Sequence, residues 1–276
     1  MGERFQLICS YLGENYYGWQ RQLKRATVQA TIEDKICSLT GQKIRIHGSG
    51  RTDRGVNALG QVAHFDLTGN CFAGKCWSDI LNDSLPLDIR IVSLRAVEQS
   101  FHARHSAEWR VYGYRFLSVE NTILKPELEW RFNPENWRPR LGEQVVAFLK
   151  NGIRTRQFSG SGGSNYVSEI WPLELELKHP SPDEMWLLVG ARSFRYKMVR
   201  CIASALGQCL GGMLSLEKLK ERLQKMDYTI KPAPAAGCYL LNVDYYQQPP
   251  ESSFAVAWQR VEDFCGFDLI NRVSGR

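Results

Sequence analysis

The chain has 276 residues, enough for one large domain or two ordinary ones, which excludes a peptide, a small disulfide-stapled scaffold or a linker. Hydrophobic residues make up 43% and charged residues 23%, close to the average for soluble globular proteins, so a fibrous or low-complexity chain is also excluded. Lys and Arg number 35 against 29 Asp and Glu, and the net charge of +6 mildly favours a polyanionic partner.

The first part of the chain predicts strands interleaved with helices. Residues 5–11 alternate as a strand does, and an aromatic, turn-rich loop follows over 13–19. Thr27 is a predicted helix N-cap and Gly41 the stop of that helix. Further along, we predict strands over 42–47 and 61–67, a helix between 75 and 85, and an extended segment over 89–97.

The second part repeats this scheme loosely. Strands are predicted over 108–119, 169–178, 185–191 and 238–245, and helices over 141–150, 196–210 and 216–226. The Gly/Ser-rich stretch 156–164 predicts a mobile loop. Residues 249–253 are predicted to form a linker. The aromatic segment that follows, 254–270, is expected to pack against the rest of the protein as a C-terminal extension. Two similar α+β halves are the economical interpretation.

The apolar stretches of the sequence bear on where the protein is located, and the spacing of its cysteines bears on metal binding. No stretch approaches the roughly 18 apolar residues of a membrane span, and the first residues lack the pattern of a targeting leader, so we expect a cytoplasmic protein without a membrane partner. The eight cysteines include no C-x-x-C pair, so we expect small buried side chains rather than disulfides or a zinc site.

The densest chemical signal is Gly48-Ser-Gly-Arg-Thr-Asp-Arg-Gly55, between two predicted strands. It lacks the closing Gly-Lys-Ser/Thr of a P-loop and opens no helix, so a nucleotide cofactor is disfavoured. Glycines let the backbone approach a ligand closely, and Arg51 and Asp53 point the same way if the segment is extended. The motif alone leaves two interpretations open, a binding site or a tight turn held by a local Arg–Asp pair.

The run from Gly48 to Asp66, ending Gln61-Val-Ala-His-Phe-Asp66, resembles the signature of the TruA family of tRNA pseudouridine synthases. Four further motifs resemble that family in the same order along the chain. They are Tyr17 to Gln20 with Thr27 to Gln29, Phe101 to Arg104 with Arg110 to Tyr114, Ser193 to Arg200, and Ala233 to Leu240.

The resemblance implies an α+β fold of the two-lobed α/β kind. Two similar ferredoxin-like or RRM-like halves would be joined through a largely antiparallel central sheet, with helices on one side. The corresponding division places an N-terminal lobe with the Gly-Arg-Thr-Asp loop at 1–104, a second lobe completing the cleft at 105–248, and an extension at 249–276.

The resemblance also implies the reaction, an isomerisation of uridine to pseudouridine in the tRNA anticodon stem-loop, at tRNA positions 38–40. The glycosidic bond breaks, the uracil turns and a carbon–carbon bond forms, without net water, oxidation or group donor. No cofactor, metal or nucleotide is therefore expected. Asp53 matches the catalytic position, and three roles stay open: attack on the sugar, attack on the base, or abstraction of a sugar proton.

Other site residues follow from the same motifs. Arg200 matches the family residue that pairs with the catalytic carboxylate; by its helix pattern alone it would be a solvated side chain. Tyr112 matches the aromatic that stacks on the target uracil, and otherwise it would be a core aromatic. Arg51, flanked by Gly50 and Thr52, is the candidate for filling the space that a flipped base leaves.

Basic residues near these motifs are candidates for phosphate contacts in the recognition of RNA by shape. They are Arg104, Arg110, Arg115, Arg192, Arg195 and Lys197. The histidines at 64, 102 and 105 are interpreted as satisfied core or surface residues. The motif departs from the family at Arg54 and Asn57, where a small residue and a histidine are usual, and Gln157 to Gly163 matches only loosely.

The expected partners are tRNA and a second copy of the chain in a homodimer that holds one tRNA. A non-catalytic protein that binds or folds tRNA is the alternative, and the presence of Asp53 argues against it. A nucleoside hydrolase would require a second carboxylate to activate water, which the motif does not suggest.

Overall fold

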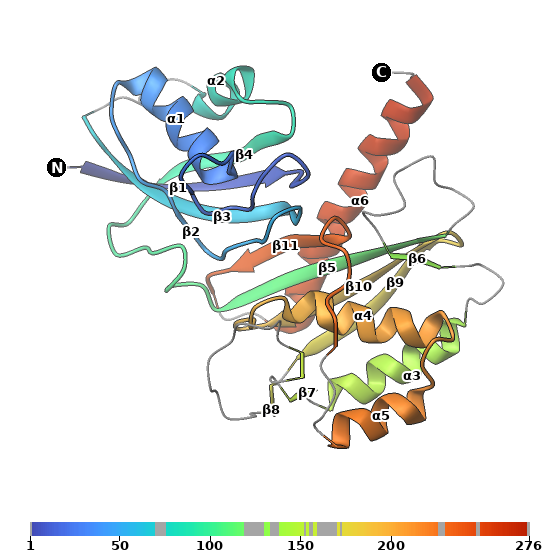
Figure 1. Cartoon of the computed structure of the whole chain (residues 1–276). Coiled ribbons are helices and arrows are strands. Elements are labelled where there is room, and N and C mark those ends of the chain that lie inside the picture. The colour runs from blue at the N-terminus through green and yellow to red at the C-terminus, as the bar shows by residue number, and fades with distance from the viewer. Residues whose placement is uncertain are drawn as a thin grey trace. The chain divides into compact units, whose positions relative to one another are not determined.

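The computed structural model describes residues 2–69, 76–118, 130–132, 138–151, 153–154, 157–158, 170–171, 173–225, 230–246 and 249–274. These residues form a mixed α/β protein with six helices and mostly antiparallel strands (Figure 1). The chain forms two compact units, Met1–Arg110 with Tyr239–Arg276, and Val111–Cys238. No helix in the described ranges is long and apolar enough to cross a membrane.

The first unit is built on strands in the spatial order β4, β1, β3, β11. Strand β1 (Gly2–Tyr11) runs antiparallel to β3 (Asn57–Thr68) and to β4 (Ile89–Val97), and β11 (Cys238–Asp244) lies parallel to β3. The short strand β2 (His47–Gly48) pairs with β3. Phe5 on β1 is paired with Phe65 on β3, and their rings stack with centroids 5.8 Å apart. This register therefore places both rings on the same face of the sheet, in the core.

Three helices belong to the first unit. Helix α1 (Val28–Thr40) and helix α2 (Trp77–Ser84) lie on the same side of its strands (Figure 1). The N-cap of α1 is Thr27, whose hydroxyl accepts from the Ala30 amide, and its C-cap is Gly41 in the left-handed conformation. Helix α6 (Pro250–Ser274) buries Phe254, Ala257 and Val261 and contacts β3.

The second unit has strands in the order β5 (Trp109–Ser118), β10 (Glu184–Ala191), β9 (Glu174–Ser181), and β6 (Trp130–Phe132) lies parallel to β5. A separate pair joins β7 (Ile153–Arg154) to β8 (Ile170–Trp171). Helix α3 (Pro139–Lys150) packs on β9 and on α4 (Met198–Leu210), which also contacts α5 (Leu216–Lys225). Every residue of α4 is buried except Arg200 and Gln208.

Three sequence predictions need correction. The strand expected over 42–47 is reduced to β2, because side chains of α1 occupy the backbone of Ile46: Glu33 accepts from its amide at 2.8 Å and Gln29 donates to its carbonyl at 3.1 Å. The strand expected over 169–178 is divided into β8 and β9. The linker expected over 249–253 is mostly helix, because α6 begins at Pro250, where proline suits the first helical turn.

Other predictions agree closely with the structure. Strand β4 has the predicted bounds, and α3, α4 and α5 begin or end within two residues of theirs. Most of the loop predicted over 156–164 lies outside the described residues, apart from Gln157 and Phe158, whose side chains are buried.

Candidate active site

The loop between β2 and β3 carries the Gly-Arg-Thr-Asp motif in the first unit. Asp53 is half-buried, Thr52 is buried, and Arg51 is exposed. The carbonyl of Asp53 accepts from the Val56 amide at 3.1 Å, which closes a turn through Gly55 at a φ of 77°. The carboxylate therefore lies at the start of a tight turn, immediately before a long buried strand.

Buried hydrogen bonds hold this loop from behind. The Thr52 hydroxyl lies 2.8 Å from the Tyr11 hydroxyl, and the Thr52 carbonyl accepts from the Trp19 amide at 3.1 Å. The side chain of Gln61 donates through Nε2 to the Gly50 carbonyl at 3.0 Å, and its Oε1 accepts from the Ser49 hydroxyl at 2.8 Å. Buried polar groups are costly without partners, so this network fixes the backbone of the motif.

Two positions beside the Asp53 loop have no room for a side chain and therefore require glycine. Gly18 has a φ of 90°, and a Cβ there would lie 2.5 Å from the Thr52 carbonyl oxygen. A Cβ on Gly48 would lie 2.5 Å from Nε1 of the buried Trp19. Tyr11 and Gln61, like Gly18, were not assigned to the site from the sequence, because the contacts that hold the loop join residues distant along the chain.

Arg110 ties a second segment to the motif. Its guanidinium donates to the Ser49 carbonyl and to the Arg104 carbonyl, each at 3.1 Å. The Tyr245 hydroxyl holds the same segment by donating to the Ala103 carbonyl at 2.7 Å. Arg104 itself is exposed, so these two arginines differ in what they can offer a ligand.

Four histidine rings lie together beside this segment. His64 and His102 have centroids 4.6 Å apart, and His47 and His105 extend the group. Nδ1 of the buried His64 accepts from the Ala103 amide at 3.1 Å. Burial, with the positive charges of neighbouring His102 and Arg4, lowers the pKa of His64 to about 4, so this ring is neutral at neutral pH. Among the described residues, no group of three or more His, Cys, Asp or Glu side chains is placed to share a metal ion.

In the second unit, Tyr112 lies on β5 and is half-buried. Its ring meets that of Phe194 edge to face, with centroids 4.9 Å apart. Edge-to-face packing fixes the orientation of an aromatic ring, so Phe194 orients Tyr112. Phe194 lies in the Ser193–Arg200 motif, but no pattern in the sequence distinguishes it from an ordinary aromatic residue.

Arg200 is one of the two residues of α4 that are not buried. Its Nε donates to the Ala233 carbonyl at 2.7 Å, and the Ala233 amide donates to the Arg200 carbonyl at 3.0 Å. The side chain is half-buried rather than a freely solvated helix residue. The segment it contacts is held in turn by Tyr114, whose hydroxyl donates to the Pro234 carbonyl at 3.1 Å.

The residues before α4 carry three of the expected RNA contacts. Arg192 is exposed, and Arg195 and Lys197 are half-buried. Lys197, the N-cap, has a φ of 59° in the left-handed region, which costs a non-glycine residue about 1–2 kcal/mol. Its ammonium lies 4.8 Å from the Tyr196 ring centroid.

Arg115 is a correction to the predicted basic surface. It is buried, and its Nε donates to Glu184 at 2.8 Å, while its guanidinium lies 5.9 Å from the Trp186 ring. The same Glu184 oxygen accepts from Trp186 Nε1 at 2.6 Å. Arg115 points into the protein because it belongs to the buried stretch of β5, so it is a structural ion pair rather than a phosphate contact.

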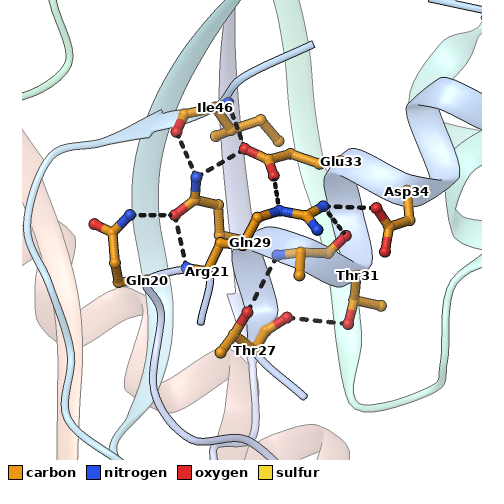
Figure 2. A network of polar contacts seen from close by, with 9 residues as sticks. Gln20, Arg21, Thr27, Gln29, Thr31, Glu33, Asp34 and Ile46 are labelled. Carbon is orange, nitrogen blue, oxygen red and sulfur yellow. Dashed lines mark hydrogen bonds and ion pairs between the residues drawn. The ribbon is translucent and has the colours of Figure 1, made fainter. Parts of the chain in front are cut away.

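A polar network at one end of α1 adjoins a cavity of about 500 Å³ in the first unit. Figure 2 shows Glu33 accepting from Arg21, Gln29 and the Ile46 amide, while Arg21 also reaches Asp34. None of the residues around the cavity belongs to the expected site; they are Gln20, Arg21, Gln29, Glu33, Asp34, Cys37, Lys43, Ile44 and Arg45. The network fixes the loop before α1 onto the helix.

Comparison with known proteins identifies the class of this site. The family model described as tRNA pseudouridine synthase matches residues 7–106 and 154–246, more than half of the chain. The matched segments include the Asp53 loop and the Arg200 helix. The chain belongs to the tRNA pseudouridine synthase family, whose members are isomerases.

Individual relatives are similar over nearly their whole length. A protein of Rippkaea orientalis named tRNA pseudouridine synthase A is 36% identical over 90% of this chain and 85% of its own. One of the same name from Maridesulfovibrio salexigens is 36% identical over 88% of this chain and 90% of its own. A third, from a Synechocystis species, is 32% identical over 96% of this chain and 97% of its own.

Proposed function

We propose that this enzyme isomerises uridine to pseudouridine in the anticodon stem-loop of tRNA, with Asp53 as its catalytic carboxylate. The observation that carries the proposal is the rigid setting of Asp53: a half-buried carboxylate at a tight turn, whose preceding backbone is fixed by Tyr11, Gln61 and Trp19. Preorganisation of this kind is what a catalytic group needs, because misplacement by about 1 Å can cost a hundredfold in rate.

The reaction balances without any added reagent. The bond between C1′ and N1 of uridine breaks, the uracil turns, and C1′ joins C5, which loses its proton while N1 gains one. A single carboxylate suffices, since no water has to be activated as in glycoside hydrolysis. Whether Asp53 attacks C1′, attacks the base or removes a sugar proton stays open in the proposal.

The second unit supplies the partners that we assign to the base and to the carboxylate. We propose that Tyr112, oriented by Phe194, stacks on the extruded uracil. Arg200 is assigned to pair with Asp53, which its anchoring to Ala233 supports by limiting the positions of the guanidinium. This assignment goes with the proposal that residues 1–104 and 105–248 form two similar ferredoxin-like halves.

RNA contacts are assigned to the residues around these two groups. Arg51 would fill the space left by the extruded nucleotide, next to Gly50 and Thr52. The exposed Arg104, together with Arg195 and Lys197, would contact phosphates. Arg110 acts in this scheme by holding the Ser49 and Arg104 carbonyls, as its two hydrogen bonds support. We also propose that the working enzyme is a homodimer, which light scattering of the purified protein tests.

The decisive experiment maps pseudouridine at single-nucleotide resolution in unmodified total tRNA incubated with the enzyme, without added metal or nucleotide. Asp53→Asn should abolish the modification and leave tRNA affinity within severalfold. The control is Asp83→Asn, which changes an exposed carboxylate on α2 and should modify tRNA normally. Tight binding without isomerisation of any tRNA would instead favour a protein that only binds or folds tRNA.

A further inference from the structure

Two exposed arginines gather on one tyrosine beside the catalytic loop. The guanidinium carbon of Arg54 lies 4.4 Å from the Tyr17 ring centroid, and that of Arg25 lies 4.6 Å from it. Both distances are within the range of a cation–π interaction. Within the described part of the chain, neither guanidinium meets a carboxylate or another hydrogen-bond acceptor. Arg54 follows Asp53 directly and is one of the two departures from the family motif.

The backbone brings these three residues together. The Tyr17 amide donates to the Ala26 carbonyl at 2.8 Å, next to Arg25, and the Trp19 amide donates to the Thr52 carbonyl at 3.1 Å, close to Arg54. The tyrosine therefore lies in a loop that is hydrogen-bonded to the segments carrying each arginine. The arrangement is built by the same contacts that hold the Asp53 loop, rather than by chance meeting of long side chains.

The turn that carries Arg25 is also preformed. Gln22 and Arg25 form an isolated β-bridge, and Gln22 Nε2 donates to the Tyr17 carbonyl at 2.9 Å. Between them, Lys24 has a φ of 59°, a strained conformation that persists only where the surroundings enforce it. Leu23 at the tip is 94% exposed. The tight turn directs Arg25 back towards Tyr17.

The positive charges of Arg25 and Arg54 beside Tyr17 favour binding of a polyanion. The two guanidinium carbons are at most about 9 Å apart, since both lie close to one ring, which is comparable to the Debye length of about 8 Å at physiological salt. Two positive charges at this separation repel each other, and no acidic side chain in the described residues pairs with them. Planar guanidinium groups with free N–H donors match phosphate oxygens.

We propose that Arg25, Tyr17 and Arg54 form a phosphate clamp for the RNA strand next to the nucleotide on which Asp53 acts. The tyrosine ring holds the two guanidinium groups in place before RNA arrives, and each group binds a backbone phosphate. Because Arg54 is joined to Asp53 by one peptide bond, the phosphates it reaches are those flanking the target uridine. The inference rests on the proposed function for the identity of the RNA.

The test measures tRNA binding in the Asp53→Asn background, so that the result does not depend on turnover. Arg54→Ala and Arg25→Ala should each weaken binding severalfold at low salt. Each should also reduce the slope of log Kd against log salt concentration by about 0.7–0.9, the value for one lost phosphate contact. Tyr17→Leu should weaken binding with a smaller change of slope, because it leaves both charges. The control is Arg140→Ala, which removes an exposed arginine on α3 and should not alter the slope.

Phosphate-ethylation interference then locates the contacts on the RNA. Ethylation of phosphates flanking the modified uridine should impair tRNA binding by the Asp53→Asn parent and not by a variant of that parent that carries both Arg25→Ala and Arg54→Ala. Unchanged slopes, or the same interference pattern in both proteins, would overturn the clamp while leaving the isomerase intact. Absence of pseudouridine from the active-enzyme assay, with these slope changes present, would instead overturn the proposed function.

Discussion

Replacing Gly18 by alanine should displace the Asp53 loop without changing any of the side chains assigned to catalysis. The added Cβ would lie 2.5 Å from the Thr52 carbonyl oxygen, whereas ordinary contact begins at 3.4 Å, so the loop backbone has to move by about 0.9 Å. Overpacking of this kind costs about 1–3 kcal/mol. The φ of 90° adds about 1–2 kcal/mol for a residue with a Cβ.

Gly41→Ala is the matched control for the conformational part of this cost. Gly41 has a φ of 71° at the end of α1, and a Cβ there would meet nothing within 4 Å. It should lose only the cost of the left-handed conformation. The difference between the two variants, about 1–3 kcal/mol, then measures the collision with the Asp53 loop.

Urea unfolding and single-turnover pseudouridine formation give the two readouts. We expect Gly18→Ala to unfold at lower urea than Gly41→Ala, and to lose on the order of a hundredfold in rate, because Asp53 is displaced by about 1 Å. Gly41→Ala should keep its rate. If the two variants lose equal stability and both retain full rate, the loop is not held against Gly18 and the reasoning is refuted.

Three further outcomes test contacts within the first unit. The free energy of unfolding should rise with pH between about 4 and 6.5, and His64 should contribute up to about 3 kcal/mol of that rise, because the folded protein protonates His64 less readily than the unfolded chain does. Urea titrations of His64→Gln over this pH range should show a smaller rise. A rise equal to that of the unmodified protein would contradict the role given to His64. Glu33→Gln, at a buried carboxylate with three donors, should cost several times more stability than Asp34→Asn at an exposed one, and equal losses in thermal melts would count against it. Thr27→Ala should cost about 1 kcal/mol through the lost cap of α1, and a neutral result would show that the cap is not used.

Elements with regular patterns were predictable from the sequence. β4 occupies the residues predicted to be extended, and Thr27 and Gly41 bracket α1 as capping chemistry requires. The segment over 42–47 alternates and was predicted as a strand, but only His47 belongs to one, because Gln29 and Glu33 from α1 bond the backbone of Ile46 instead. Local pattern indicates that a segment is extended, but not which group will pair with its amides.

The motif that contains Asp53 was recognisable because its residues are consecutive. The network that holds it was not, because its members come from three separate segments: Tyr11 lies on β1, Trp19 in the loop after β1, and Gln61 on β3. Each of these residues has an ordinary core interpretation by itself. A candidate catalytic group can therefore be proposed from sequence, while the contacts that hold its loop require coordinates.

The basic residues illustrate the same limit for binding. The net charge of +6 counts every arginine equally. In the structure, however, Arg115 is buried against Glu184, Arg110 donates to two backbone carbonyls, and Arg54 is exposed with its guanidinium over the Tyr17 ring. A cation that is already paired inside the protein releases no counterion when it meets a phosphate, so it adds nothing to the salt dependence of RNA binding. The salt slope should consequently follow the basic residues assigned to phosphates, which are Arg25, Arg54, Arg104, Arg195 and Lys197, and neither the net charge nor the number of arginines within the motifs should predict it.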